Sequence, residues 1–282
     1  DWQVWSFSRL VRGSPNQATV DLRPGTGDAD GLQAIADPAQ EQGPAGAAFG
    51  TAVHAVFEKT DFATWQDASG VPDSGRSLIE RSLRDQGLAS GDAALKRAIE
   101  TTAACVRNAL NAPLPCGVRL CDIPRAQHKA EIEFHLSLRP VRSGELYALL
   151  HRHGYQKQRS DVAPERLHGL LTGKIDLVFA HAGRFHIVDW KTNRIAPYDD
   201  AAMRAEIATH DYDLQWLIYT LALHRWLRQR ITGYDYDRHV GEAYYLFVRG
   251  MAEGDGIHAD RPPRELIEAM DALFDARAED SA

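Results

Sequence analysis

The feature that most constrains this chain is a pair of apolar segments, LLTGKIDLVFA (170–180) and RFHIVDWKT (184–192), joined by only three residues. Apolar runs of this length with so short a connection predict two antiparallel strands of a β-hairpin. Each segment carries one acid, Asp176 in the first and Asp189 in the second. A carboxylate among apolar neighbours is costly unless another group pairs with it. The hairpin therefore predicts a chemical site as well as part of a fold.

The rest of the chain mixes helical and strand periodicity. Strands are predicted at QHKAEIEFHLSL (127–138), where apolar and polar residues alternate, and at EAYYLFVRG (242–250), which a polar loop follows at 251–263. Helices are predicted, in chain order, over 47–60, 74–87, 92–111, 144–154, 200–229 and 263–277. Because helices and strands do not alternate evenly, this order favours an α/β fold with a small mixed central sheet flanked by helices.

The first part of the chain has a different character. Glycine and proline recur over 13–46 with little apolar periodicity, which is typical of a mobile connector. The sequence therefore predicts an N-terminal segment and flexible connector at 1–46, followed by one folded domain at 47–282. A chain of 282 residues is long enough for a substantial core in that domain.

Composition excludes several classes of protein. The formal net charge of −7 argues against a generic nucleic-acid coat protein, although not against an enzyme that acts on nucleic acid. No apolar run is long enough to span a bilayer, and the N-terminal residues do not show the pattern of a secretory signal, so we expect no membrane contact. Three cysteines (Cys105, Cys116 and Cys121) do not make a disulfide framework, and a cytoplasmic location is expected. No phosphate-loop motif is present, so no ATP site is expected in this chain.

Lys191 extends the chemistry of the hairpin. It follows Asp189 by two residues, so both side chains point to the same face of a strand. Two carboxylates beside an ammonium group suit a divalent cation such as Mg²⁺, which prefers oxygen ligands. The alternative is an ordinary Asp189–Lys191 salt bridge on a solvent face, and the residues alone do not decide between the two.

These motifs carry a family resemblance. GKIDL followed by DWK resembles the core motif of the PD-(D/E)XK nuclease superfamily. FGTAVHAVFE, HKAEIEF, FHIVDWKTN and HDYDLQWLIYTLALHRWLRQRI resemble, in order, the C-terminal nuclease domain of RecB, the helicase–nuclease subunit of the bacterial RecBCD enzyme. The resemblance implies a restriction-endonuclease-like core and assigns 47–282 to a RecB-type nuclease domain.

The resemblance also implies a set of metal ligands. His54, Asp176, Asp189 and the backbone carbonyl of Trp190 match the positions that hold Mg²⁺, as one or two ions. Lys191 matches the catalytic lysine. A histidine on an apolar helix such as His54 is otherwise more often a packed residue than a ligand. Some RecB-like nucleases contain a four-cysteine iron–sulfur cluster, but the three cysteines of this chain do not fit it, so no cluster is expected.

Three further residues are catalytic candidates by the same resemblance. Glu131 matches an additional active-site acid, with an exposed strand carboxylate as the alternative. Gln215 and Tyr219 form the Q-x-x-x-Y motif of RecB-type members and share one helix face. The alternative for these two is an ordinary amphipathic helix with Tyr219 in the core.

The end of that helix is basic. HRWLRQR (224–230) concentrates arginines that either contact phosphates or lie solvated at a helix C-terminus, where the dipole favours cations. The two interpretations have equal weight here.

The function implied is that of a Mg²⁺-dependent deoxyribonuclease of exonuclease V type. Such a domain hydrolyses single-stranded DNA, and duplex DNA after unwinding, in double-strand break repair by homologous recombination. RecC and RecD subunits are the implied partners, and loading of RecA onto single-stranded DNA is a further implied role. The alternative is a catalytically inactive nuclease-like scaffold, although degenerate domains lose the acids or the lysine that this chain retains.

Overall fold

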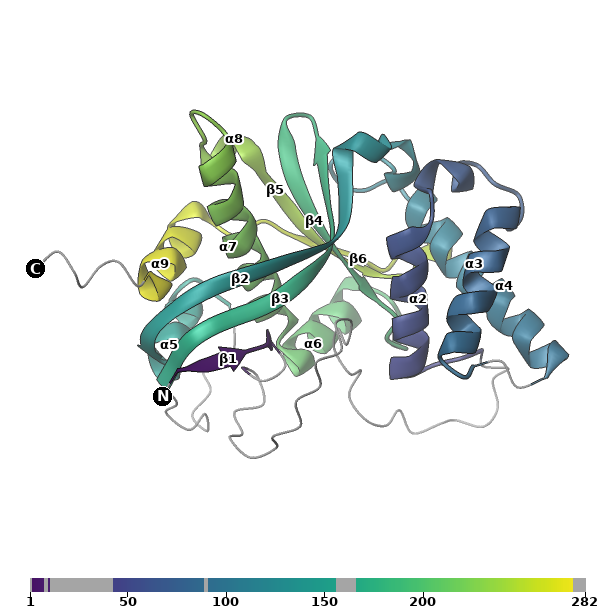
Figure 1. The fold of residues 1–282 in the computed structure, drawn as a ribbon, viewed down its shortest axis with the longest axis horizontal. Helices are drawn as coiled ribbons and strands as arrows, with labels where there is room; N and C mark the ends of the chain where they lie inside the picture. The colour runs from purple at the N-terminus through teal and green to yellow at the C-terminus, as the bar shows by residue number, and fades with distance from the viewer. Residues whose placement is uncertain (1, 8–9, 11–42, 89–90, 156–165, 276–282) are drawn as a thin grey trace, which may run out of the picture.

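The computed structural model describes the chain except for residues 1, 8–9, 11–42, 89–90, 156–165 and 276–282 (Figure 1). The predicted connector at 13–46 thus lies almost entirely outside the described residues. The strands are β1 (Gln3–Trp5), β2 (His128–Arg142), β3 (Arg166–His181), β4 (Arg184–Lys191), β5 (Val240–Phe247) and β6 (Ile257–Asp260). The helices are α2 (Ala47–Lys59), α3 (Asp73–Asp85), α4 (Asp92–Asn111), α5 (Ser143–Arg152), α6 (Asp200–His210), α7 (Tyr212–Arg230), α8 (Tyr236–His239) and α9 (Arg264–Phe274).

The six strands form one mixed sheet, which confirms the predicted architecture. β3 is its longest strand and pairs along its length with β2. Its other edge pairs with β1 at Gly169–Leu171 and then with β4 from Leu177 onward. β4 and β5 run parallel, and β6 closes the sheet antiparallel to β5. Along the β1–β4 edge of β3, residues 172–176 therefore have no ladder partner among the described strands.

The β3–β4 hairpin has a two-residue turn, one residue shorter than the connection predicted from the sequence. Only Ala182 and Gly183 lie between the strands, and both have positive φ, 48° and 78°. Two central residues with positive φ are the geometry of a type I′ turn, whose twist matches the twist of paired strands. The predicted hairpin is confirmed.

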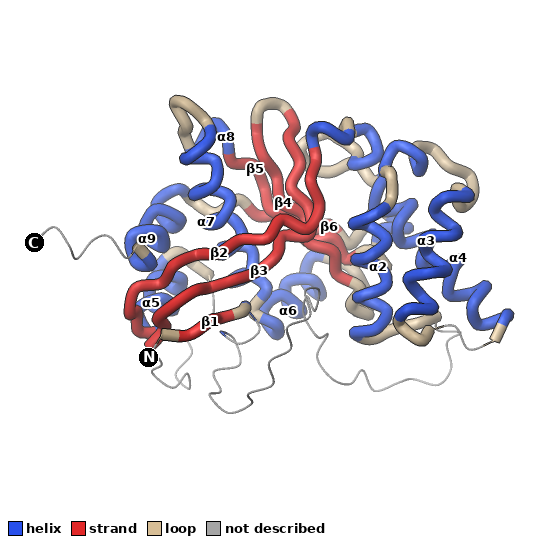
Figure 2. Tube along the Cα trace, in the orientation of Figure 1, coloured by secondary structure: helices blue, strands red, loops and turns tan. Residues whose placement is uncertain are grey.

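Two groups of helices cover the two faces of the sheet (Figure 2). Apolar residues of α5, α7 and α9 form one core with inward side chains of β3, β4 and β5. Apolar residues of α2, α3 and α4 form the second core with the opposite side chains of the same strands. α7 is buried on most sides, with thirteen buried residues, and forms the centre of its layer. In the part of the chain that the structure describes, no helix is long and apolar enough to cross a membrane.

Three details differ from the sequence-based expectation. The helix predicted over 200–229 is two helices, because Asp211 adopts a left-handed conformation (φ 54°) between α6 and α7. The predicted polar loop at 251–263 contains β6, which pairs with β5. The segment Gln3–Trp5 is a strand that was not predicted. It pairs close to Gly169, where a Cβ would lie 1.9 Å from the Gln3 carbonyl oxygen.

Candidate active site

The two acids of the hairpin lie side by side at the end of the β3–β4 ladder. Leu177 and Val188 form the last pair of that ladder, so Asp176 and Asp189 are the next residues on the two strands. Oδ2 of Asp176 accepts a hydrogen bond of 2.9 Å from the backbone N–H of Trp190. The hairpin thus carries both carboxylates to one place, beside the stretch of β3 that lacks a ladder partner on that edge.

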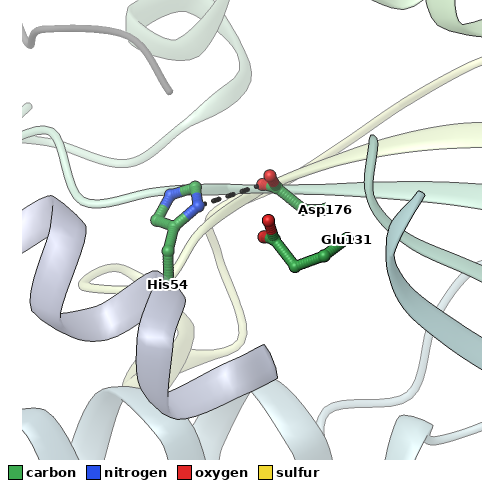
Figure 3. A group of neighbouring side chains, drawn as sticks. All are labelled: His54, Glu131 and Asp176. Atoms are coloured by element: carbon green, nitrogen blue, oxygen red, sulfur yellow. Dashed lines mark ion pairs between the residues drawn. The ribbon is translucent and has the colours of Figure 1, made fainter. Parts of the chain in front are cut away.

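α2 brings His54 against the same strand end. Three residues further along α2, Phe57 stacks on Trp190 with ring centroids 3.8 Å apart and planes 6° apart. His54 Nδ1 lies 3.4 Å from Asp176 Oδ2, and Nε2 lies 2.8 Å from the Trp190 carbonyl oxygen. The imidazole therefore lies between a carboxylate and a backbone carbonyl, and it points at Asp176 (Figure 3).

Electrostatics make this contact an ion pair. Burial lowers the pKa of His54, but the neighbouring Asp176 carboxylate raises it, and the resulting pKa is about 9. Burial raises the pKa of Asp176, yet the imidazolium outweighs it and holds that pKa below its ordinary value. At neutral pH the metal-free pair is thus imidazolium and carboxylate. A cation that binds both groups must displace the imidazole proton.

Glu131 joins this group through an unusual backbone. It lies within β2 but has a φ of 54°, a conformation that residues other than glycine rarely adopt. Its carboxylate forms an ion pair of 2.9 Å with Lys174 Nζ on the neighbouring strand. Burial raises the pKa of Glu131, while Lys174 lowers it in part. Strained backbone of this kind is concentrated at functional sites.

His54, Glu131 and Asp176 could hold a metal ion together. Each offers one ligand atom, and these atoms lie within 4.8 Å of one another (Figure 3). One imidazole nitrogen and two carboxylates, with the Trp190 carbonyl at the same point, are a donor set that suits a hard divalent cation. The residues present therefore fit a divalent metal ion.

Asp189 and Lys191 form a second, deeper half of the site. Lys191 Nζ lies 2.8 Å from Asp189 Oδ2, and the two side chains are only 6% and 3% exposed. Nζ also donates to Gln215 Oε1 on α7 at 3.1 Å and lies 3.9 Å from the centre of the Tyr212 ring. The salt bridge that the sequence offered as an alternative does exist, but it is buried and faces α7 rather than solvent.

The Q-x-x-x-Y pair is part of this half. Gln215 Nε2 donates to the hydroxyl of Tyr219 at 3.0 Å, and Gln215 Oε1 accepts from the hydroxyl of Tyr245 at 2.6 Å. The amide oxygen thus accepts hydrogen bonds from both a lysine and a tyrosine, which determines the orientation of the amide. Both side chains lie on one face of α7, as the four-residue spacing predicted, and Tyr219 also belongs to the apolar core, which was the alternative.

The predicted site residues therefore fall into two neighbouring groups. His54, Asp176 and the Trp190 carbonyl meet at one point, and Glu131 lies with them. The Asp189 carboxylate, assigned from the sequence as a metal ligand, is paired with Lys191, so its role as a ligand stays a prediction.

Two contributors were missed by the sequence interpretation. Tyr245 lies opposite Asp189 in the β4–β5 register and binds Gln215, and Lys174 pairs with Glu131. Alternation along EAYYLF places Tyr245 on one face, but only the parallel pairing with β4 shows that this face is the site. No role was predicted for Lys174 from the sequence, because its pairing with Glu131 depends on the register of β2 against β3.

The structure also separates the arginines at the end of α7. Arg225 and Arg228 both bind the Asp271 carboxylate of α9, Arg228 at 2.7 Å. The Arg230 guanidinium lies 4.5 Å from the centre of the Trp226 ring. Two of the three arginines thus link helices, which is a structural role that neither sequence interpretation included.

Comparisons with known proteins show which sequences this chain resembles. A family model described as the PD-(D/E)XK nuclease superfamily matches residues 27–281. The RecBCD enzyme subunit RecB of Escherichia coli (strain K12) is 33% identical over 97% of this chain and 23% of its own length. The RecB subunit of Haemophilus influenzae is 36% identical over 56% of this chain and 14% of its own length. That of Mycolicibacterium smegmatis is 29% identical over 83% of this chain and 24% of its own length. The chain thus spans about a quarter or less of each of these relatives.

Proposed function

Because this chain belongs to the PD-(D/E)XK nuclease superfamily, we propose that it is a Mg²⁺-dependent deoxyribonuclease domain that hydrolyses phosphodiester bonds of single-stranded DNA. The observation that carries the proposal is the meeting of His54, Asp176 and the Trp190 carbonyl beside a buried lysine. Loss of a ligand or of the lysine would be expected in an inactive scaffold, and this chain retains the full set.

The residues divide the work between cation binding and charge stabilisation. His54, Asp176 and the Trp190 carbonyl would hold Mg²⁺, with Asp189 and Glu131 as further carboxylates for the same ion or a second one. Bound Mg²⁺ polarises a phosphate oxygen and lowers the pKa of a bound water molecule. The five groups converge from α2, β2, β3 and β4, so the fold itself holds them in place before DNA arrives.

Lys191 supplies a second, fixed positive charge. Asp189 and Gln215 Oε1 hold its ammonium group on two sides, and α7 excludes water from the contact. A preorganised cation in a site of low polarity stabilises the charge that develops on a phosphate during hydrolysis. Tyr219 and Tyr245 hold Gln215, so these two are positioning residues for the lysine.

Similarity to RecB supports a wider role for the longer protein. We place the domain in a RecBCD-type helicase–nuclease, with RecC and RecD subunits as partners, acting on duplex DNA that a motor has unwound during double-strand break repair. A role in loading RecA and a location in the cytoplasm belong to the same proposal.

The decisive experiment is a cleavage assay on end-labelled single-stranded DNA, in Mg²⁺ and in EDTA. We expect the wild-type chain to cleave the DNA in Mg²⁺ and not in EDTA. The Asp176→Asn and Lys191→Gln variants should not cleave it in either. Asp85→Asn, an exposed acid at the end of α3, is the matched control and should retain activity.

Metal titration by calorimetry separates the roles of these two residues. Asp176→Asn should lose Mg²⁺ binding, whereas Lys191→Gln should bind the metal and fail to cleave. Full cleavage by Asp176→Asn would disprove the site, and a wild-type chain that neither binds metal nor cleaves would favour the scaffold.

A further inference from the structure

A groove lies between the second half of α7 and the β2–β3 strands. It encloses about 730 Å³ and is lined on the strand side by Phe134 and Lys129, and on the helix side by Trp226 and Arg230. None of these residues belongs to the metal-binding or lysine groups of the candidate site. The groove is therefore a separate feature whose role the proposed chemistry leaves open.

One face of α7 carries residues of both the candidate site and the groove. Residues 215, 219, 223, 226 and 230 are spaced by three or four, so they form one stripe on the helix. Gln215 and Tyr219 lie in the site, whereas Trp226 and Arg230 line the groove. Tyr219 meets the ring of Phe134, a groove residue, edge-on at 5.7 Å between centroids. With a rise of 1.5 Å per residue, Trp226 lies about 16 Å along the helix from Gln215.

Trp226 gives the groove an aromatic platform. Its side chain is among the few large apolar groups that are exposed, at 42%. The Phe185 ring packs against the indole edge-on, with ring centroids 6.5 Å apart and planes at 67°. The Arg230 guanidinium lies over one face of the indole, 4.5 Å from the ring centre, so a base would stack on the opposite face. An exposed indole with an arginine beside it is the combination that stacks a nucleobase and contacts its phosphate.

The charge of the lining favours the same occupant. Four cationic side chains line the groove (Lys129, Arg225, Arg228 and Arg230), against three acids (Glu133, Asp271 and Asp275). This is a local excess of cations in a chain whose net charge is −7. Asp271 is already engaged by Arg225 and Arg228, and the Arg228 side chain remains 52% exposed. The ion pair thus shields much of the acid while it leaves an arginine at the mouth of the groove.

We propose that this groove binds single-stranded DNA a few nucleotides from the cleaved bond, with one base stacked on Trp226 and a phosphate near Arg230. The inference rests on the proposed nuclease function and extends it, because it names where the strand lies outside the metal centre. Binding along α7 would hold the strand at a fixed distance from Lys191, so that a phosphate is presented to the site.

Affinity for oligothymidylates of about 4 and about 16 nucleotides tests the groove, because single-strand sites span such lengths. Fluorescence anisotropy is measured on the 282-residue chain with Ca²⁺ in place of Mg²⁺, so that binding is separated from cleavage. We expect Trp226→Ala to weaken binding of the longer strand about tenfold or more, the loss typical of one stacked base. The gain in affinity from short to long strand should nearly disappear in that variant.

Matched variants make the result interpretable. Trp2→Ala removes the other exposed tryptophan, which is 63% exposed just before β1, and should bind as wild type does. Trp226→Phe retains a ring and should restore most of the affinity, whereas Arg230→Gln should flatten the dependence of affinity on salt. If Trp226→Ala matches Trp2→Ala, or weakens short and long strands equally, the groove proposal is wrong. Loss of cleavage in Asp176→Asn tests the nuclease function separately, so the two failures are distinguishable.

Discussion

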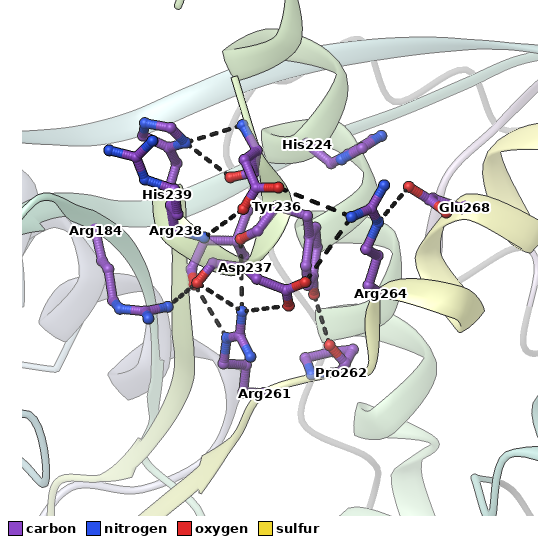
Figure 4. A network of polar contacts seen from close by, with 12 residues as sticks. Arg184, His224, Tyr236, Asp237, Arg238, His239, Arg261, Pro262, Arg264 and Glu268 are labelled. Carbon is purple, nitrogen blue, oxygen red and sulfur yellow. Dashed lines mark hydrogen bonds and ion pairs between the residues drawn. The ribbon is translucent and has the colours of Figure 1, made fainter. Parts of the chain in front are cut away.

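Two clusters of charged residues in this molecule have similar chemistry and opposite surroundings. At the candidate site, Asp189 and Lys191 are 3% and 6% exposed and meet Gln215 and Tyr245 on the inner side of α7. Around α8, Arg261 and Arg264 bind Asp237, with side chains 31%, 45% and 58% exposed. The second cluster joins α8 to the segment before α9, through Arg261, and to the start of α9, through Arg264 (Figure 4).

The difference indicates what each cluster is for. Exposed ion pairs contribute little to stability and cost little to form. A buried pair loses the hydration of both ions, and apolar residues of the same volume are often as stable or more so. A fold has no need of a buried Asp189–Lys191 pair for stability, so we attribute it to function. The predictions below test that contrast, from the largest expected effect to the smallest.

The largest effect is expected from breaking the buried pair on one side. Lys191→Met leaves the Asp189 carboxylate buried without its ammonium partner, which should lower the free energy of unfolding by about 3–5 kcal/mol. The double variant Asp189→Asn with Lys191→Met removes both charges and should regain most of that loss. Urea unfolding measures both, and both should be inactive on single-stranded DNA.

The exposed pair of Glu80 and Arg84 on α3 is the matched control for this cycle. Arg84→Met, alone or with Glu80→Gln, should change the free energy of unfolding by less than about 1 kcal/mol. If the buried double variant is no more stable than Lys191→Met, the two charges are not coupled and the contrast fails.

A buried titratable group away from the site gives the next largest effect. The Glu242 carboxylate lies 2.9 Å from His186 Nδ1, and the Glu242 backbone nitrogen lies 3.2 Å from the same atom. The carboxylate favours the protonated ring, but burial outweighs it, so we treat His186 as neutral rather than as an ion-pair partner. Burial lowers the pKa of His186 to about 4, from an ordinary value of 6.5.

The unfolded chain therefore binds a proton at His186 between pH 6.5 and 4 that the folded chain does not bind. The stability contributed by the neutral ring is fully present above pH 6.5, and roughly 3 kcal/mol is lost as the pH falls to 4. His186→Gln should unfold with a flatter dependence on pH in this range, whereas His135→Gln, an exposed control on β2, should not. Identical pH profiles for wild type and His186→Gln would contradict the assignment.

A smaller effect is expected from the backbone of Glu131. A left-handed conformation costs residues other than glycine about 1–2 kcal/mol. Glu131→Gly should therefore be more stable than Glu131→Ala by about 1 kcal/mol, although both should bind Mg²⁺ more weakly than wild type. Glu133, two residues further along β2, is not among the residues with positive φ. At this position the order of stability should reverse, so that Glu133→Gly is less stable than Glu133→Ala. Equal stability of the two Glu131 variants would contradict the inference that the backbone at Glu131 is strained.

These residues also show which features of the fold and of the site can be predicted from the sequence. The hairpin, its two acids and the Gln215–Tyr219 face follow from local periodicity, because neighbouring residues in one element determine them. The positions of Glu131 and Tyr245 do not follow from local periodicity. That of Glu131 depends on a single dihedral angle, and that of Tyr245 depends on parallel pairing with β4, a strand distant in sequence.

The elements that were predicted wrongly also depend on features other than local periodicity. β6 has four residues and was predicted as a loop, because it gains its conformation from pairing with β5 rather than from its own pattern. The break at Asp211 interrupts a continuous helical pattern, and only a tolerance of aspartate for positive φ would indicate it.

The smallest effect is expected in the exposed cluster around α8. Arg264 donates to Glu268 at 2.7 Å and lies 3.8 Å from Asp235 and 3.9 Å from Asp237, with its own side chain 45% exposed. Water replaces these contacts at little cost, and salt screens them. Arg264→Gln should therefore unfold thermally within the scatter of repeated wild-type scans, at low and at high salt, and should cleave DNA normally. A clear loss of stability or activity would mean that this cluster also supports the site, and exposure would then fail to separate structural charge pairs from functional ones.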